Sequence, residues 1–116
     1  HEFADECAKR PRDYCLLDYL YTHAREHLLL QMGRGFFEGA LEAGCALVCL
    51  DGLDEAGSAA GRQALCEAVR ALAERYPRSR YVVTSRIVGY GEAPLDGREF
   101  AEHRVLPLTD EDIREF

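Results

Sequence analysis

A run of five apolar residues, 46–50, constrains the fold of this chain more than any other feature. The run shows no alternation of polar and apolar residues and stops abruptly at Asp51. Continuous apolar strands are typical of parallel sheets in which helices cover both faces. A second β-branched and aromatic run, 81–83, ends in the same way at Thr84 and Ser85. The sequence therefore predicts an α/β fold with parallel strands and crossover helices.

Apolar residues that recur at intervals of three and four positions predict helices around these strands. Asp13 is the expected N-cap of the first helix, Gly44 a left-handed stop for the second, and Pro77 the end of the third. The helices are expected over residues 14–31, 36–41 and 62–76.

The last part of the chain carries weaker signals. A short third strand is expected at residues 105–106, which are Val and Leu. Thr109 followed by Asp112 forms a capping-box pattern, so a final helix is expected to begin at the residue after Thr109. That helix is expected to bury Ile113 and Phe116.

Length, charge and cysteine content narrow the class of protein. A chain of 116 residues makes one domain at most, and its 14 basic against 21 acidic side chains form no basic patch of the kind nucleic acids require. The longest uncharged apolar stretch lies far below the roughly 20 residues of a membrane helix, so a cytoplasmic location is expected. Five cysteines without a CxxC pair indicate reduced thiols.

Three carboxylates lie within five residues after the first apolar run: Asp51, Asp54 and Glu55. Such groups repel one another unless a cation lies among them. Mg²⁺ is the expected cation, because it prefers one or two carboxylates together with water and a substrate phosphate. Asp51 is the expected Mg²⁺ anchor, and Asp54 or Glu55 is expected to orient or deprotonate an attacking water.

The second run is followed by groups that suit a phosphate. Thr84 and Ser85 supply hydroxyls, and Arg86 supplies a permanent cation that can contact a terminal phosphate oxygen. Ligands in parallel sheets bind beyond the carboxyl ends of the strands, so both polar clusters are expected side by side at one edge. Together they form half of a phosphoryl-transfer site.

The pattern ALVCLDGLDEA, followed some thirty residues later by RYVVTSR, resembles the NACHT family of STAND-class P-loop NTPases. The resemblance implies a partial P-loop NTPase three-layer fold, in which Asp51 binds Mg²⁺ and Asp54 and Glu55 activate water. It also implies that Arg86, with Ser85 and Thr84, senses the terminal phosphate. Members of the family bind ATP or GTP, switch between nucleotide states, and oligomerise in innate immunity or defence against phage.

One element of that family is missing from the sequence. A GxxxxGK[ST] phosphate loop needs a lysine after its glycines, and the only lysine, Lys9, follows Cys7 and Ala8. Residues 1–116 are therefore expected to be the Walker B and sensor 1 half of a NACHT domain, with the first strand and phosphate loop upstream. By itself this half is expected neither to hold nucleotide tightly nor to fold stably. The parent is expected to form homo-oligomers and to carry sensor and effector domains.

The sequence leaves two other interpretations open. His23, Glu26 and His27 spell HxxEH, the inverted motif of zinc hydrolases, in which two histidines hold zinc and the glutamate activates its water. A third ligand would have to come from elsewhere, with Glu99 and Glu102 as guesses. Alternatively, the chain is a catalytically dead module that keeps the NTPase fold for protein contacts.

Overall fold

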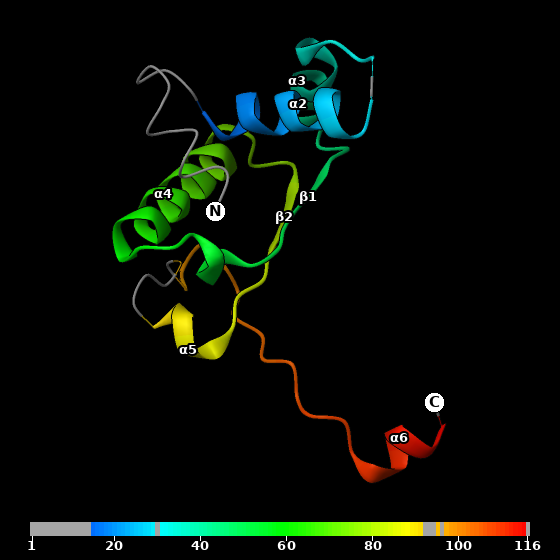
Figure 1. The fold of residues 1–116 in the computed structure, drawn as a ribbon. Helices are drawn as coiled ribbons and strands as arrows, with labels where there is room; N and C mark the ends of the chain where they lie inside the picture. The colour runs from blue at the N-terminus through cyan, green and yellow to red at the C-terminus, as the bar shows by residue number, and fades with distance from the viewer. Residues whose placement is uncertain (1–14, 30, 92–94, 96, 116) are drawn as a thin grey trace.

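The computed structural model describes residues 15–29, 31–91, 95 and 97–115. The chain has an α/β fold in which two parallel strands are joined by a helix (Figure 1). In chain order the elements are α2 (Leu16–His27), α3 (Arg34–Ala43), β1 (Leu47–Leu50), the 3₁₀ turn η1 (Leu53–Glu55), α4 (Ala59–Arg75), β2 (Arg80–Val83), α5 (Ile87–Tyr90) and α6 (Asp110–Glu115).

The two strands pair in parallel along their whole length. The register places Leu47 opposite Arg80 and Leu50 opposite Val83. Because α4 is the crossover between them, the carboxyl ends of both strands meet at one edge of the sheet. This is the arrangement expected from the sequence, and it determines where the polar clusters lie.

Most helix ends lie within three residues of the expected positions, but α2 ends at His27, four residues before its expected end. α2 starts after Cys15, two residues later than expected, and the expected cap Asp13 lies outside the described residues. α4 starts three residues earlier than expected because the Ser58 hydroxyl accepts the Gly61 N–H at 3.0 Å. α3 ends as predicted at Gly44, whose φ of 73° is left-handed.

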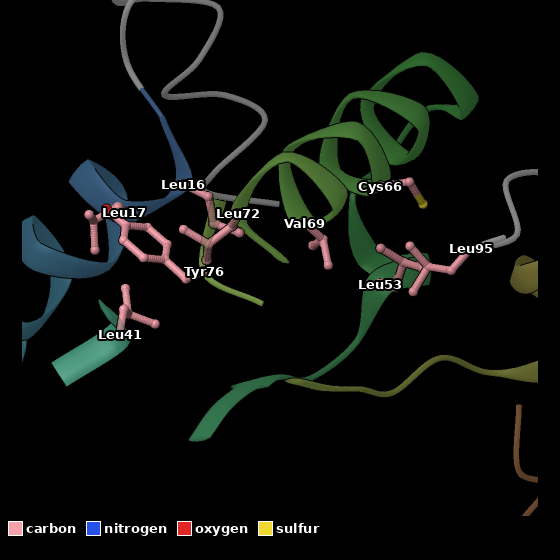
Figure 2. Close-up of a cluster of buried hydrophobic side chains, with 9 residues drawn as sticks. All are labelled: Leu16, Leu17, Leu41, Leu53, Cys66, Val69, Leu72, Tyr76 and Leu95. Atoms are coloured by element: carbon pink, nitrogen blue, oxygen red, sulfur yellow. The ribbon is translucent and has the colours of Figure 1, made fainter. Parts of the chain in front are cut away.

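The core lies along α4 and links both ends of the sheet. Figure 2 shows Leu72 of α4 and Tyr76, the residue after α4, beside side chains of α2 and α3, and Cys66 near Leu53 and Leu95 at the other end. Val69, between these groups, is fully buried. The Tyr81 hydroxyl donates to backbone carbonyls at the end of α4, 3.1 Å from that of Tyr76 and 3.2 Å from that of Leu72.

The sheet is covered on one face only within the described residues, so the expectation of burial on both faces is wrong. Val48 and Leu50 pack against the core, whereas Leu47 is 60% exposed. On the neighbouring strand, Val82 is 48% exposed. The uninterrupted apolar run misled the prediction because it is compatible with one covered face as well as with two.

The expected third strand is also absent from the described residues. Val105 and Leu106 belong to no strand and are 93% and 76% exposed. β-propensity alone does not form a strand when no neighbour accepts its hydrogen bonds, and Pro107 removes a donor at this position. Figure 1 shows this segment leading away from the sheet to α6.

The final helix forms where predicted, but it is not buried as predicted. α6 begins at Asp110, and the Ile113 N–H donates to the Thr109 carbonyl at 3.0 Å. Ile113 is nevertheless 58% exposed, because α6 lies apart from the core. Phe116 lies outside the described residues.

The cysteines of the described segments are all free, as expected. Cys15, Cys45 and Cys49 are exposed, while Cys66 is buried in the core, where desolvation raises the pKa of its thiol. None of the helices in the described segments is long and apolar enough to cross a membrane.

Candidate functional site at the carboxyl ends of the strands

Asp51 is the first residue after β1, at the point where the chain leaves the sheet. Gly52 follows in a left-handed conformation with φ of 76°, which lets the chain turn at once into η1. The Thr84 hydroxyl donates to the Asp51 carboxylate and accepts the Gly52 N–H at 3.1 Å. One hydroxyl from the end of β2 therefore holds the chain leaving β1.

The next turn is held by main-chain pairing as well. The Leu53 N–H donates to the Thr84 carbonyl at 2.9 Å, and the Leu53 side chain is buried in the core. These two contacts fix η1 against the end of β2. They place Asp54 and Glu55 on the side of η1 that faces the residues after β2.

Asp54 is the most enclosed acid of the cluster, with its side chain 12% exposed. Its carboxylate accepts hydrogen bonds from the Arg86 backbone N–H at 3.0 Å and from the Ser85 hydroxyl at 3.4 Å. Its other oxygen lies 3.2 Å from Arg86 Nε in an ion pair. The Arg86 backbone N–H, more than the guanidinium, lowers the pKa of Asp54 below its ordinary value. Asp54 is therefore held ionised by the residues that follow β2.

Glu55 completes the contacts of the guanidinium. Arg86 Nη2 lies 3.0 Å from Glu55 Oε1, while the two side chains are 74% and 61% exposed. An exposed ion pair of this kind contributes little to stability, typically below about 1 kcal/mol. Arg86 thus joins both acids of η1 at the surface, where an entering anion could compete for it.

The sequence predicted that Asp51, Asp54, Glu55 and Arg86 lie together, and the structure brings them to one edge. The structure adds a partner that the sequence did not predict for two of the acids. Arg86 lies between Asp54 and Glu55 and contacts both carboxylates. Sequence reasoning placed Arg86 at this edge but assigned it to a terminal phosphate, so it did not predict this pairing.

Asp51 is the residue at this edge that fits a Mg²⁺ ion. Its carboxylate is exposed and contacts a neutral hydroxyl, whereas Asp54 and Glu55 are paired with a cation. The described residues contain no cluster of three or more metal-ligating side chains. An anchor with a single carboxylate suits Mg²⁺, which keeps several waters and takes further oxygens from a bound phosphate.

The HxxEH motif does not assemble a catalytic zinc site in the described part of the chain. His23 and His27 are neighbours on α2, but Glu26 contacts Arg25 Nη2 at 3.4 Å. Glu99, one of the guesses for a third ligand, pairs with Arg70 at 3.0 Å. The three protein ligands that catalytic zinc needs are therefore not brought together there.

A shallow hollow of about 480 Å³ lies elsewhere, at the turn between α2 and α3. It is lined by Tyr21, Arg25, Leu29, Gln31, Met32 and Gly33. The strand-end cluster, which consists of Asp51, Asp54, Glu55 and Arg86, contributes no residue to this hollow.

Comparison with family models, with curated proteins and with solved structures found no match to this chain.

Proposed function

We propose that this chain is part of a nucleotide-dependent switch of the NACHT type, which binds and hydrolyses ATP or GTP with Mg²⁺. The observation that carries the proposal is the meeting of Asp51, Asp54, Glu55 and Arg86 at the carboxyl edge of two parallel strands. Carboxyl edges are where ligands bind in sheets of this kind. The P-loop NTPase fold, homo-oligomerisation, immune or anti-phage signalling and a cytoplasmic location belong to the same proposal.

Each residue has a role in this proposal. Asp51 would hold Mg²⁺, which supplies charge neutralisation for the phosphates when bound. Arg86 would turn from the acids to the terminal phosphate, since a guanidinium binds phosphate oxygens as readily as carboxylates. Thr84 keeps Asp51 in place through its hydroxyl.

The contacts of Arg86 suggest when the acids become available. While Arg86 contacts both acids, the carboxylate oxygens of Asp54 and Glu55 are engaged with its guanidinium and are less free to bond a water. A terminal phosphate that draws Arg86 away would free one of them to orient or deprotonate water. Glu55 is the better candidate, because Asp54 also accepts the Arg86 backbone N–H and would keep that contact.

The proposal needs a phosphate-cradling loop, so the test uses a chain that carries such a loop together with residues 1–116. Glu55→Gln is expected to slow hydrolysis while preserving binding of Mg·ATP or Mg·GTP, measured by phosphate release and by isothermal titration. Asp51→Ala is expected to weaken Mg²⁺-dependent binding by about 1–3 kcal/mol, the range for lost charge-assisted contacts. Glu67→Gln, an exposed change on α4, is the matched control and should alter neither quantity.

The alternative, a catalytically dead module, predicts a different pattern. Nucleotide would then bind without turnover or not at all, and Glu55→Gln would change nothing. Binding that is unaffected by Asp51→Ala would contradict the magnesium role. Turnover that survives Glu55→Gln but not Asp54→Asn would transfer the role of base to Asp54.

A further inference from the structure

Two imidazole rings lie one helical turn apart on α2. His23 and His27 are four positions apart, and their ring centroids are 4.5 Å apart with an angle of 35° between the planes. Residues at this spacing are neighbours on one helix face. His27 is exposed and His23 is partly exposed, so a solute can reach the pair.

The surroundings hold the pair in place. The His23 ring stacks on Tyr19, with centroids 5.8 Å apart and planes 30° apart. The charged residues between the histidines are engaged with other groups, because the Arg25 guanidinium lies 5.6 Å from the centre of the Tyr21 ring and Arg25 Nη2 contacts Glu26. The nearest cation on the helix is thus bound to a neighbouring ring and acid.

We propose that His23 and His27 form a two-imidazole chelate for a borderline divalent transition metal such as Ni²⁺, Cu²⁺ or Zn²⁺. Imidazole nitrogen suits these metals, whereas Mg²⁺ and Ca²⁺ prefer oxygen ligands. No third metal-ligating side chain joins the pair within the described residues, so water completes the coordination. The site stands apart from the strand-end cluster and does not depend on nucleotide binding.

Isothermal titration with Ni²⁺ tests the site, on the chain that carries the phosphate-cradling loop together with residues 1–116. His23→Gln and His27→Gln each remove one ligand and are expected to lower the Ni²⁺ affinity about tenfold or more. Loss of a group that only supports a ligand already costs about tenfold, so loss of the ligand itself should cost at least as much. The double variant should bind Ni²⁺ with nearly the same affinity as either single variant, because a chelate needs both ligands. His103→Gln, at an exposed histidine with no place in the pair, is the matched control and should titrate like the wild type.

Exposed thiols also bind Ni²⁺, but they are common to all four variants, so the comparison isolates the histidines. Equal titration curves for wild type and His27→Gln would overturn the chelate. So would single variants that each lose a separate, independent site.

A second readout is thermal unfolding, in which Ni²⁺ should raise the midpoint of the wild type more than that of His27→Gln, because a ligand of the folded state stabilises it. Equal shifts would also overturn the proposal.

Discussion

The two ends of the β1–β2 sheet are held together by different forces. At the end where the strands begin, α2, α3 and the last turn of α4 pack through apolar side chains such as Leu16, Leu41 and Tyr76. At the end where the strands stop, Asp51, Asp54 and their partners form hydrogen bonds and ion pairs near solvent. The first end is held mainly by apolar burial, whereas the second adds charged groups near solvent to the buried side chains of Leu53, Cys66 and Leu95.

The largest expected effect tests the apolar end. Leu41→Ala removes a side chain that is only 4% exposed and should lower the free energy of unfolding by about 2–5 kcal/mol through lost burial and a cavity. Leu47→Ala, on the bare face of β1, is the matched control and should change it by less than about 0.5 kcal/mol. Urea titration of the chain that carries the phosphate-cradling loop together with residues 1–116 measures both. If Leu47→Ala lowered the free energy of unfolding as much as Leu41→Ala, the face of β1 that carries Leu47 would have to be covered in solution.

The turn that leads from α3 into β1 should tolerate change poorly. Gly44 has a φ of 73°, and an added Cβ would lie 2.8 Å from the Arg78 carbonyl oxygen. Gly44→Ala should therefore destabilise the chain by about 1–2 kcal/mol or more, the cost of a left-handed residue with a side chain. Gly39→Ala, inside α3 with nothing within 4 Å of the added atom, should be neutral or stabilising by up to about 1 kcal/mol. The opposite order in thermal unfolding would contradict this account.

The polar end should respond less to the loss of a single hydrogen-bonding group. Thr84→Val removes the hydroxyl that joins Asp51 and Gly52 and should cost about 0.5–1.5 kcal/mol in the free energy of unfolding. Thr84→Ser keeps the hydroxyl and should recover most of that loss. If Thr84→Val lowered the free energy of unfolding as much as Leu41→Ala, the two ends of the sheet would not differ in how much a single side chain stabilises them.

The smallest effect concerns pH. Because the pKa of Asp54 is lowered in the folded chain, its ionised form stabilises the fold above the ordinary aspartate pKa of about 3.9, and this stability is lost as pH falls through the lower folded value. Asp54→Asn should therefore flatten the acid part of the profile of melting temperature against pH. Ser85→Ala, which removes the 3.4 Å contact with Asp54 and the 3.2 Å contact with the Arg86 carbonyl, should keep most of the wild-type profile, because the Arg86 backbone N–H is the main cause of the lowered pKa of Asp54. A superimposable profile for Asp54→Asn would contradict the assignment.

Much of the fold was predictable from local patterns. Period-3.6 apolar spacing located α2, α3 and α4, and the stops at Gly44 and Pro77 held to within two residues. The third strand at 105–106 and the burial of Ile113 were not predictable in this way, because both depend on neighbours that the described residues do not provide.

The sequence by itself determined α2, α3, α4 and α6, the two strands and the fact that polar groups follow both strands, since each of these depends on residues close together along the chain. Tertiary structure decided that β1 and β2 pair in register, that the described residues leave one face of the sheet exposed, and that Arg86 lies between Asp54 and Glu55. The last contact joins residues 31 and 32 positions apart. It arises only when the strands and η1 pack together, so no local pattern of residues encodes it.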